Sequence, residues 1–206
     1  MNTDPSRDET LTLEILDAID RDEHVSQRHL AGSMGVALGL ANSYLKRCVR
    51  KGLVKVTHAP ANRYLYYLTP KGFAEKSRLT ARYLSYSLSF YRKAGESCLR
   101  LFDECERNGW RRLVLCGISD LAEIATLRAM ERDITVIGYL DMDPGGERAK
   151  FLSRPVWREY PSVEAHDACV LTELQSPQLI YDQLQGLMTT DRILVPDVLA
   201  IGGSRG

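Results

Sequence analysis

The stretch SQRHLAGSMGVALGLANSYLKRCVRKGLVKVTHAPANRYLYYLT, residues 26–69, decides the fold of the N-terminal half of the chain. Ser26 is a good N-cap for a first short helix, because its hydroxyl can accept a free backbone N–H. In the helix that follows, Ala41, Leu45 and Cys48 recur at spacings of four and three and form one buried stripe. The pattern predicts two helices joined by a tight turn.

A β-hairpin is expected directly after the second helix. Gly52 ends that helix, and the segments VKV, residues 54–56, and RYLYYL, residues 63–68, indicate two strands around a short loop. Two helices joined by a tight turn and followed by a hairpin make a winged helix-turn-helix. In that fold the second helix enters the DNA major groove, and the hairpin, called the wing, lies over the flanking backbone.

The distribution of charge favours DNA as the partner. Residues 24–94 hold thirteen Lys or Arg side chains and a single acid, Glu75, although the whole chain carries 27 side chains of each sign. An ordinary solvated face mixes both signs. Neutralisation of phosphates explains the basic segment directly, so we expect double-stranded DNA as a ligand.

The polar side of the second helix and its surroundings supply the expected DNA contacts. Four residues of that helix are expected to face the major groove: Asn42, Ser43, Lys46 and Arg47. Five others are expected to position the domain on phosphates, the last two of them from the wing: Gln27, Arg28, Arg50, Lys55 and Arg63.

A helix before this stretch and a long one after it complete the N-terminal part. TLTLEILDAIDRD, residues 10–22, has one apolar face and is expected to pack behind the helix-turn-helix with its acids in solvent. Thr69 and Pro70 are a strong helix start, and the helical pattern continues to about Asn108. Within it an apolar seam repeats at alternating four and three: Leu84, Leu88, Tyr91, Gly95, Cys98, Phe102 and Cys105.

Two interpretations of this seam stay open, namely packing on the protein's own domains and an intersubunit coiled coil. A homodimer is attractive in either case, because one winged helix reads only a few base pairs. The expected domains are 1–69 (winged helix-turn-helix), 70–109 (linking or dimerisation helix) and 110–206 (α/β domain).

Length and composition describe an ordinary protein of two modest domains, with 206 residues of which 44% are hydrophobic. The first twenty residues contain no apolar run, and no segment approaches the length of a membrane span. The five cysteines form no CxxC pair and no Cys/His cluster. We therefore expect a cytoplasmic protein with neither a signal peptide nor structural zinc.

Strands alternate with helices in the C-terminal half. Four apolar runs predict strands: 111–118, 134–143, 167–174 and 192–199. Helices are predicted at 119–133 and 176–188. This alternation implies a parallel sheet with right-handed crossovers, and hence a Rossmann-like domain in a chain of α/β class overall.

The first strand of that half is followed by a degenerate dinucleotide fingerprint. The motif G-x-G-x-x-G/A appears as GISDLA, where Ser119 replaces the middle glycine and Asp120 puts a negative charge where an anion would lie. Asp141 follows the second strand, near the place of the ribose-binding acid. We therefore expect an effector pocket near Gly117, Ser119, Asp120 and Asp141, with no particular cofactor indicated.

Two family resemblances accompany these patterns. Through SQRHLA, LGLANSYLKRCVRKGLVKV and YYLTPKGFAEKSRLTARYL the chain resembles MarR-type winged-helix regulators, particularly those associated with exopolysaccharide genes, which implies a transcriptional regulator. Through LVLCGISDLAEIA, VIGYLDMDPGGERAKFLSRPVW and HDACVLTEL it resembles Rossmann-like sugar-nucleotide or CoA-binding domains of polysaccharide-biosynthesis proteins. That second resemblance implies a ligand flanked by Gly117, Ser119 and Asp141. The domain order is also similar to that of Rex redox-sensing repressors.

Together these observations predict a sequence-specific DNA-binding regulator, controlled by a nucleotide, sugar-nucleotide or CoA-type ligand and linked to polysaccharide genes. Two alternatives remain open. One is a nucleotide- or sugar-nucleotide-dependent enzyme tethered to DNA, although the sequence shows no catalytic constellation. The other is a DNA-binding protein whose α/β domain serves only to pair subunits.

Overall fold

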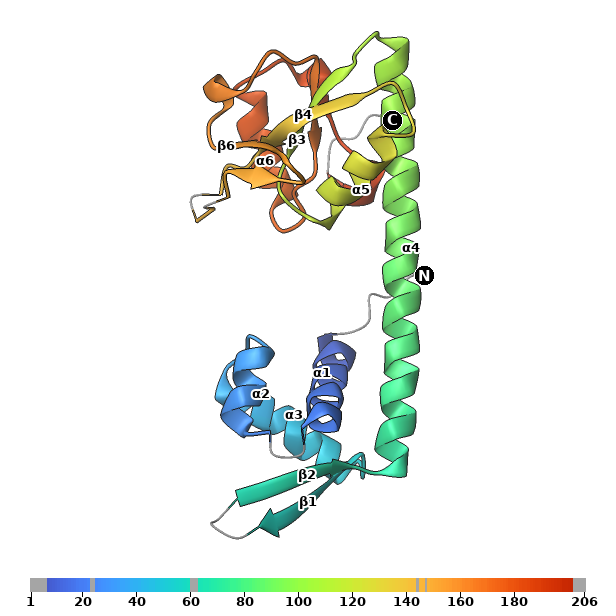
Figure 1. Ribbon diagram of the computed structural model, residues 1–206, viewed down its shortest axis with the longest axis vertical. Coiled ribbons are helices and arrows are strands. Elements are labelled where there is room, and N and C mark those ends of the chain that lie inside the picture. The colour runs from blue at the N-terminus through green and yellow to red at the C-terminus, as the bar shows by residue number, and fades with distance from the viewer. Residues whose placement is uncertain (1–6, 23–24, 60–62, 144, 147, 202–206) are drawn as a thin grey trace. The chain divides into compact units, whose positions relative to one another are not determined.

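Two compact units make up the chain, Met1–Ser89 and Phe90–Gly206, and the helix α4, Pro70–Arg107, contributes to both (Figure 1). The division therefore falls within α4, and the three-part organisation expected from the sequence stays a prediction. The computed structural model describes residues 7–22, 25–59, 63–143, 145–146 and 148–201.

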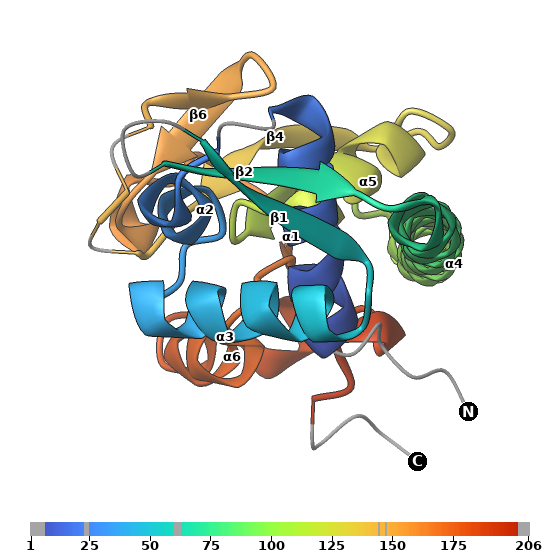
Figure 2. The same cartoon turned by 90° about the horizontal axis from the view of Figure 1, so that it is seen from below.

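The N-terminal unit contains three helices before α4 and one hairpin (Figure 2). The helices are α1, Arg7–Arg21; α2, Gln27–Ser33; and α3, Leu38–Arg50. The strands β1, Val54–Ala59, and β2, Arg63–Leu68, pair in antiparallel fashion. The winged helix-turn-helix arrangement predicted from residues 26–69 is confirmed.

Local chemistry begins and ends these elements where the sequence indicated. The Ser26 hydroxyl accepts the backbone N–H of His29 at 3.1 Å and caps α2. Gly35 has φ of +60° in the turn between α2 and α3, a conformation that costs glycine little. The buried stripe of α3 joins α1 and the wing in one core that includes Ile15, Leu16, Leu30, Leu45, Cys48 and Tyr66.

The start of α4 is fixed to the turn that follows α3. The Thr69 hydroxyl donates to the carbonyl of Gly52 at 2.6 Å and accepts the N–H of Gly72 at 3.0 Å. Gly72 lies so close to the preceding chain that an added Cβ would meet the carbonyl oxygen of Leu53 at 2.0 Å. Only glycine leaves room for the helix to begin there.

The C-terminal unit is a six-stranded sheet in the order β5-β6-β4-β3-β7-β8. Its neighbouring strands pair in parallel except at the β5 edge. Counted along the chain, the five parallel strands lie in the order 3-2-1-4-5, so the direction of winding reverses between β3 and β7. The strands are β3, Arg112–Cys116; β4, Thr135–Leu140; β5, Lys150–Phe151; β6, Arg154–Trp157; β7, Ala168–Leu171; and β8, Ile193–Leu194.

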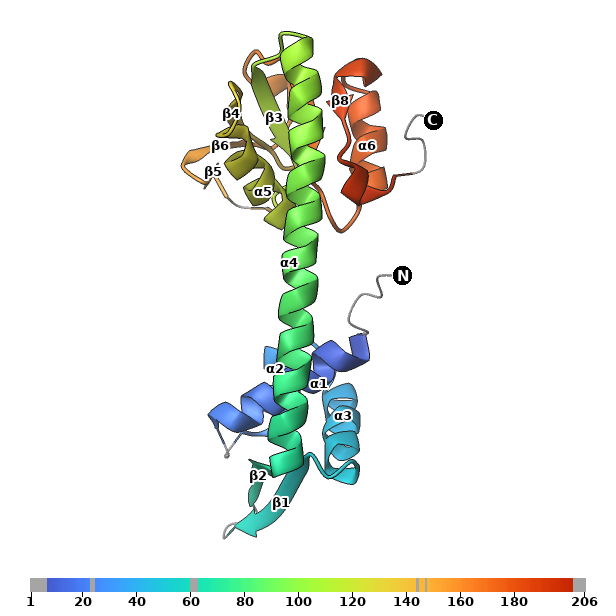
Figure 3. The same ribbon diagram turned by 90° about the vertical axis from the view of Figure 1, so that its right-hand side faces the viewer.

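Helices cover both faces of this sheet (Figure 3). On β3, Leu113 and Leu115 point into a core shared with α4 and with α5, Asp120–Ala129. Val114 and Cys116, which alternate with them, point into a second core that contains Leu184 of α6, Pro177–Gln185. Three 3-10 turns complete the unit: η1, Tyr160–Ser162; η2, Thr190–Arg192; and η3, Asp197–Leu199.

The parallel sheet was expected, but β5 and β6 were not. Both are short, and Pro155 interrupts the apolar pattern of β6, so neither gives a strand signal in the sequence.

The apolar seam of α4 divides into two parts. Cys98, Phe102 and Cys105 are fully buried in the first core of the C-terminal unit. Leu84, Leu88 and Tyr91 are 53%, 59% and 39% exposed. The C-terminal part of the seam therefore packs on the protein's own sheet and α5, which leaves only the earlier part open to another subunit.

Candidate DNA interface and ligand cleft

The exposed side of α3 carries Ser43, Lys46 and Arg50, opposite its buried stripe. These three residues lie beside Gln27 of α2 and Tyr64 of β2. Together they help to line a groove of about 640 Å³ between α2, α3 and the wing. The structure thus brings four of the nine expected DNA-contacting residues together.

Arg47 lies to one side of that face and contacts α1. Its guanidinium forms an ion pair with Asp8, with Nη1 and Oδ2 2.7 Å apart. The hydroxyl of Tyr44 donates to the other oxygen of the same carboxylate. These two hydrogen bonds, that from Tyr44 first, hold the pKa of Asp8 below its usual range. The guanidinium expected in the major groove is therefore bound to an acid of the same unit.

The remaining expected contacts are distributed around the groove. Asn42 is half-buried, and its Oδ1 is buried with no hydrogen-bond partner among the described residues. Arg28 of α2 and Lys55 of β1 are exposed. Arg63 is the first residue of β2, opposite Ala59, and its side chain lies outside the described part of the chain.

The acids of α1 do not simply face solvent, as the sequence led us to expect. Glu9 pairs with Arg82 at 2.7 Å, and Lys76 pairs with Asp17 and Asp20 at 2.9 and 2.6 Å. Each of these contacts neutralises a base of α4. Within the described residues, no ion pair involves Arg28, Lys46, Arg50 or Lys55. The uncompensated positive charge is therefore concentrated around α3 and its flanks.

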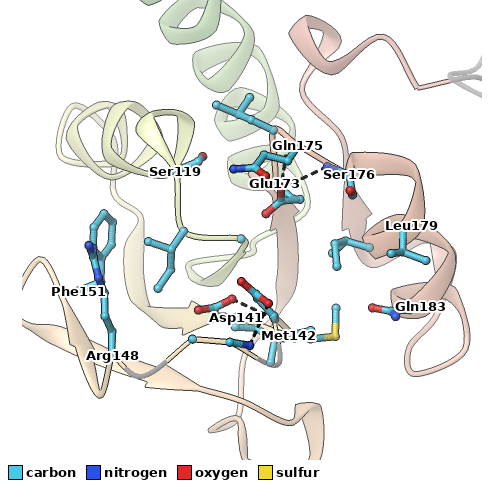
Figure 4. Close-up of a pocket in the computed structure, with 18 of the residues that line it drawn as sticks. Ser119, Asp141, Met142, Arg148, Phe151, Glu173, Gln175, Ser176, Leu179 and Gln183 are labelled. Carbon is cyan, nitrogen blue, oxygen red and sulfur yellow. Dashed lines mark hydrogen bonds between the residues drawn. The ribbon is translucent and has the colours of Figure 1, made fainter. Parts of the chain in front are cut away.

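A cleft of about 1310 Å³ opens in the C-terminal unit at the carboxyl ends of β3, β4 and β7 (Figure 4). Its lining includes all four residues expected for an effector pocket: Gly117, Ser119, Asp120 and Asp141. Asp141 and Glu173 extend into it from the ends of β4 and β7. Glu173 was missed in the sequence, although its position after a predicted strand is the same signal that selected Asp141.

Gly117 is required by the protein's own packing. Its φ is +105°, and an added Cβ would lie 2.5 Å from the backbone nitrogen of Glu173. Its carbonyl accepts the hydroxyl of Thr172 at 2.6 Å. The turn after β3 is thus pressed against the segment after β7.

Ser119 uses its hydroxyl inside the protein. The Oγ donates to the carbonyl of Thr172 at 2.5 Å and accepts the N–H groups of Leu121 and Ala122 at 3.1 and 3.3 Å. It is therefore the N-cap of α5, and it occupies donors that a bound phosphate would need.

The two acids that extend into the cleft also have internal partners. Glu173 accepts the N–H groups of Gln175 and Ser176 at 2.7 and 3.3 Å, just before α6. Asp141 forms an ion pair with Arg158 at 2.5 Å and accepts the N–H of Asp143 at 3.2 Å. These contacts fix both carboxylates in place.

Residues 8–55 match a protein family described as winged helix-turn-helix DNA-binding. The segment runs from α1 to the start of β1 and contains the whole of α3. The N-terminal unit is a winged helix-turn-helix DNA-binding domain. The match ends before α4, so it says nothing of the C-terminal unit.

Solved structures of regulators are similar to part of the chain. MepR of Staphylococcus aureus, a regulator of the multidrug efflux pump MepA, is 19% identical over 40% of this chain and 61% of its own, with a TM-score of 0.35. PcaV of Streptomyces coelicolor is 22% identical over 48% of this chain and 76% of its own, with a TM-score of 0.39. The chain thus spans about three fifths of MepR, and TM-scores this low carry no argument about function. No curated protein matches the chain significantly.

Two further searches of the structure gave no additional site. No described helix combines the length and the apolar character needed to cross a membrane. Among the described residues, no group of three or more His, Cys, Asp or Glu side chains is arranged to hold a metal ion.

Proposed function

We propose that the protein is a MarR-type transcription regulator that binds double-stranded DNA sequence-specifically, with α3 in the major groove and β1 and β2 over the flanking backbone. The observation that carries this proposal is the exposed side of α3. Ser43, Lys46 and Arg50 lie there with no ion pair to any described residue, while acids of α1 neutralise bases elsewhere in the unit.

Individual side chains would divide the work of recognition. Ser43 and Lys46 are placed to reach base edges, because they lie near the middle of the exposed face. Gln27, Arg28, Arg50, Lys55 and Arg63 would position the domain on phosphates. Asn42 and Arg47, at the two margins of the face, would join the base contacts once Arg47 leaves Asp8.

The C-terminal unit is proposed to be a Rossmann-like effector domain. Its strand order reverses between β3 and β7, and open α/β sheets bind ligands at the carboxyl ends of the strands beside such a reversal. The cleft lies at that place. A ligand there would change operator affinity only if it bound one arrangement of the DNA-binding domains better than another. The link to polysaccharide genes rests on the sequence resemblances alone.

The protein is further proposed to act as a homodimer. Leu84, Leu88 and Tyr91 form an exposed apolar stripe on α4, and a second copy of the stripe would cover it. Two-fold pairing would also double the DNA contacts and favour a palindromic operator.

Selection of bound duplexes from a random pool tests the proposed function. The full chain should enrich one motif, and Lys46→Ala should weaken binding to that motif by about tenfold or more while relaxing preference at one or two positions. Lys150→Ala, which removes an exposed charge from β5, is the matched control and should leave the affinity unchanged. If no motif is enriched, or if Lys46→Ala binds like the wild type, the proposal is wrong.

A further inference from the structure

We propose that the cleft at the carboxyl ends of β3, β4 and β7 binds a small organic cation, an amine or guanidine with an apolar body, instead of a phosphate-bearing nucleotide. The inference rests on the proposal that this cleft is an effector site, and it names the chemical class of the effector.

The sites that would hold a phosphate in such a fold are already filled. A diphosphate binds at the N-terminus of the helix after the first strand, where free N–H groups point at its oxygens. In this protein the Ser119 hydroxyl accepts two of those N–H groups, from Leu121 and Ala122. At the start of α6, the other helix that begins at the cleft, the carboxylate of Glu173 accepts the N–H groups of Gln175 and Ser176.

The glycine turn offers no substitute. In a dinucleotide site the glycines let the backbone approach the pyrophosphate. Here the space beside Gly117 holds the backbone of Glu173, at 2.5 Å from where a Cβ would lie. The close approach that glycine permits is therefore made by the protein itself.

The charge of the lining points in the same direction. Four carboxylates at the cleft form no ion pair with a described residue, and Arg148 is the one basic side chain among the described residues that line it. Asp141 adds a fifth carboxylate, which Arg158 neutralises at 2.5 Å. A phosphate would meet net repulsion there, whereas an ammonium or guanidinium would be attracted. The four unpaired acids are Asp120, Glu123, Asp143 and Glu173.

The rest of the lining suits an apolar body. The side chains of Ile118, Met142 and Phe151 lie on one side of the cleft's list of contacts, and Leu179 and Ile180 come from α6. Ligand sites in proteins combine such apolar walls with a few convergent polar groups. Because the polar groups here are almost all acceptors, the ligand must supply donors and positive charge. A neutral sugar would supply the donors without the charge.

Calorimetric titration of the full chain with matched probes tests this inference. The cationic probes are agmatine, spermidine and phenethylamine, and the comparison probes are ADP-ribose, which carries a diphosphate, and glucose, which is neutral. We expect at least one cation to bind with a 1:1 ratio and with an affinity that falls as salt is added, while ADP-ribose and glucose do not bind.

Variants locate the binding site. The double substitution Asp120→Asn with Asp143→Asn removes two exposed carboxylates and should weaken cation binding by about tenfold or more. Asp191→Asn, an exposed acid outside the cleft, is the matched control and should change nothing. Circular dichroism of the double variant checks that the fold is retained.

Several results would overturn the inference: binding of none of the three cations, binding of ADP-ribose or glucose in the cleft, or cation binding that the double substitution leaves unchanged. The measurement involves no DNA, so it fails or succeeds separately from the proposed function. Saturable cation binding with unaltered DNA affinity would keep the ligand class and remove the regulatory role.

Discussion

Asp8 is the residue that competes most directly with DNA for a side chain of the recognition helix. Its carboxylate holds Arg47 at 2.7 Å and accepts the hydroxyl of Tyr44. Because exposed ion pairs contribute little, this contact should yield to phosphate, but at a measurable cost in affinity. We predict that Asp8→Asn tightens DNA binding by roughly twofold to fivefold in an anisotropy titration.

Glu14→Gln is the control for this prediction. It removes an exposed acid from the same helix, and no contact of Glu14 with Arg47 exists in the described part of the unit. Equal tightening by both variants would mean that Asp8 acts only through net charge, and no tightening by Asp8→Asn would remove its role.

Asp167 should make the stability of the C-terminal unit depend on pH. One oxygen of its carboxylate accepts the backbone N–H groups of Arg111 and Arg112, each at 2.8 Å, and these bonds lower the pKa of Asp167. A lowered native pKa stabilises the fold above the ordinary carboxylate pKa of about 4, and this contribution is lost as pH falls through the native value. Asp167→Ala should therefore cost about 1 kcal/mol near pH 7 in urea unfolding. The same cost near pH 2 would contradict this assignment.

Among the helices, α4 depends on a single glycine for its start. Gly72→Ala would place a Cβ 2.0 Å from the carbonyl oxygen of Leu53, and backbone cannot move aside as a side chain can. The strain should exceed the gain of up to about 1 kcal/mol in helix propensity and leave a net loss of about 1–2 kcal/mol in unfolding free energy. Gly39→Ala on α3, with nothing within 4 Å of the new Cβ, should be neutral or stabilising.

Elements with a strong local pattern were predictable from the sequence. The stripe of Ala41, Leu45 and Cys48 on α3 and the alternation of strands and helices after residue 110 both reflect repeating burial on one face. The two-residue β5 has too few residues to repeat a pattern.

The candidate sites show the same limit. Gly117, Ser119, Asp120 and Asp141 could be grouped because the carboxyl ends of parallel strands meet. The pairing of Arg47 with Asp8 could not be predicted, because the two residues lie 39 positions apart on different helices and their meeting depends on how α1 packs against α3.

For the whole molecule, the exposed stripe on α4 predicts self-association. Leu88 is 59% exposed, and Leu84 and Tyr91 lie one turn away on either side. Leu88→Glu should convert a dimer into a monomer in sedimentation velocity and lower DNA affinity, because each protomer would then bind alone. Leu187→Glu, at an apolar residue 45% exposed in the C-terminal unit, is the control. A wild-type chain that sediments as a monomer at all concentrations would contradict the dimer.

The salt dependence of DNA binding tests the central claim most directly, because it counts the phosphates that the protein neutralises. The affinity of the full chain for duplex DNA should fall linearly on logarithmic axes as salt rises, with a slope of about −0.9 for each phosphate contacted. Replacing Arg28 and Lys55 together with Ala should make that slope shallower by roughly 2 per protomer. A slope near zero for the wild type, or an unchanged slope for the double variant, would contradict the assignment of this face to DNA.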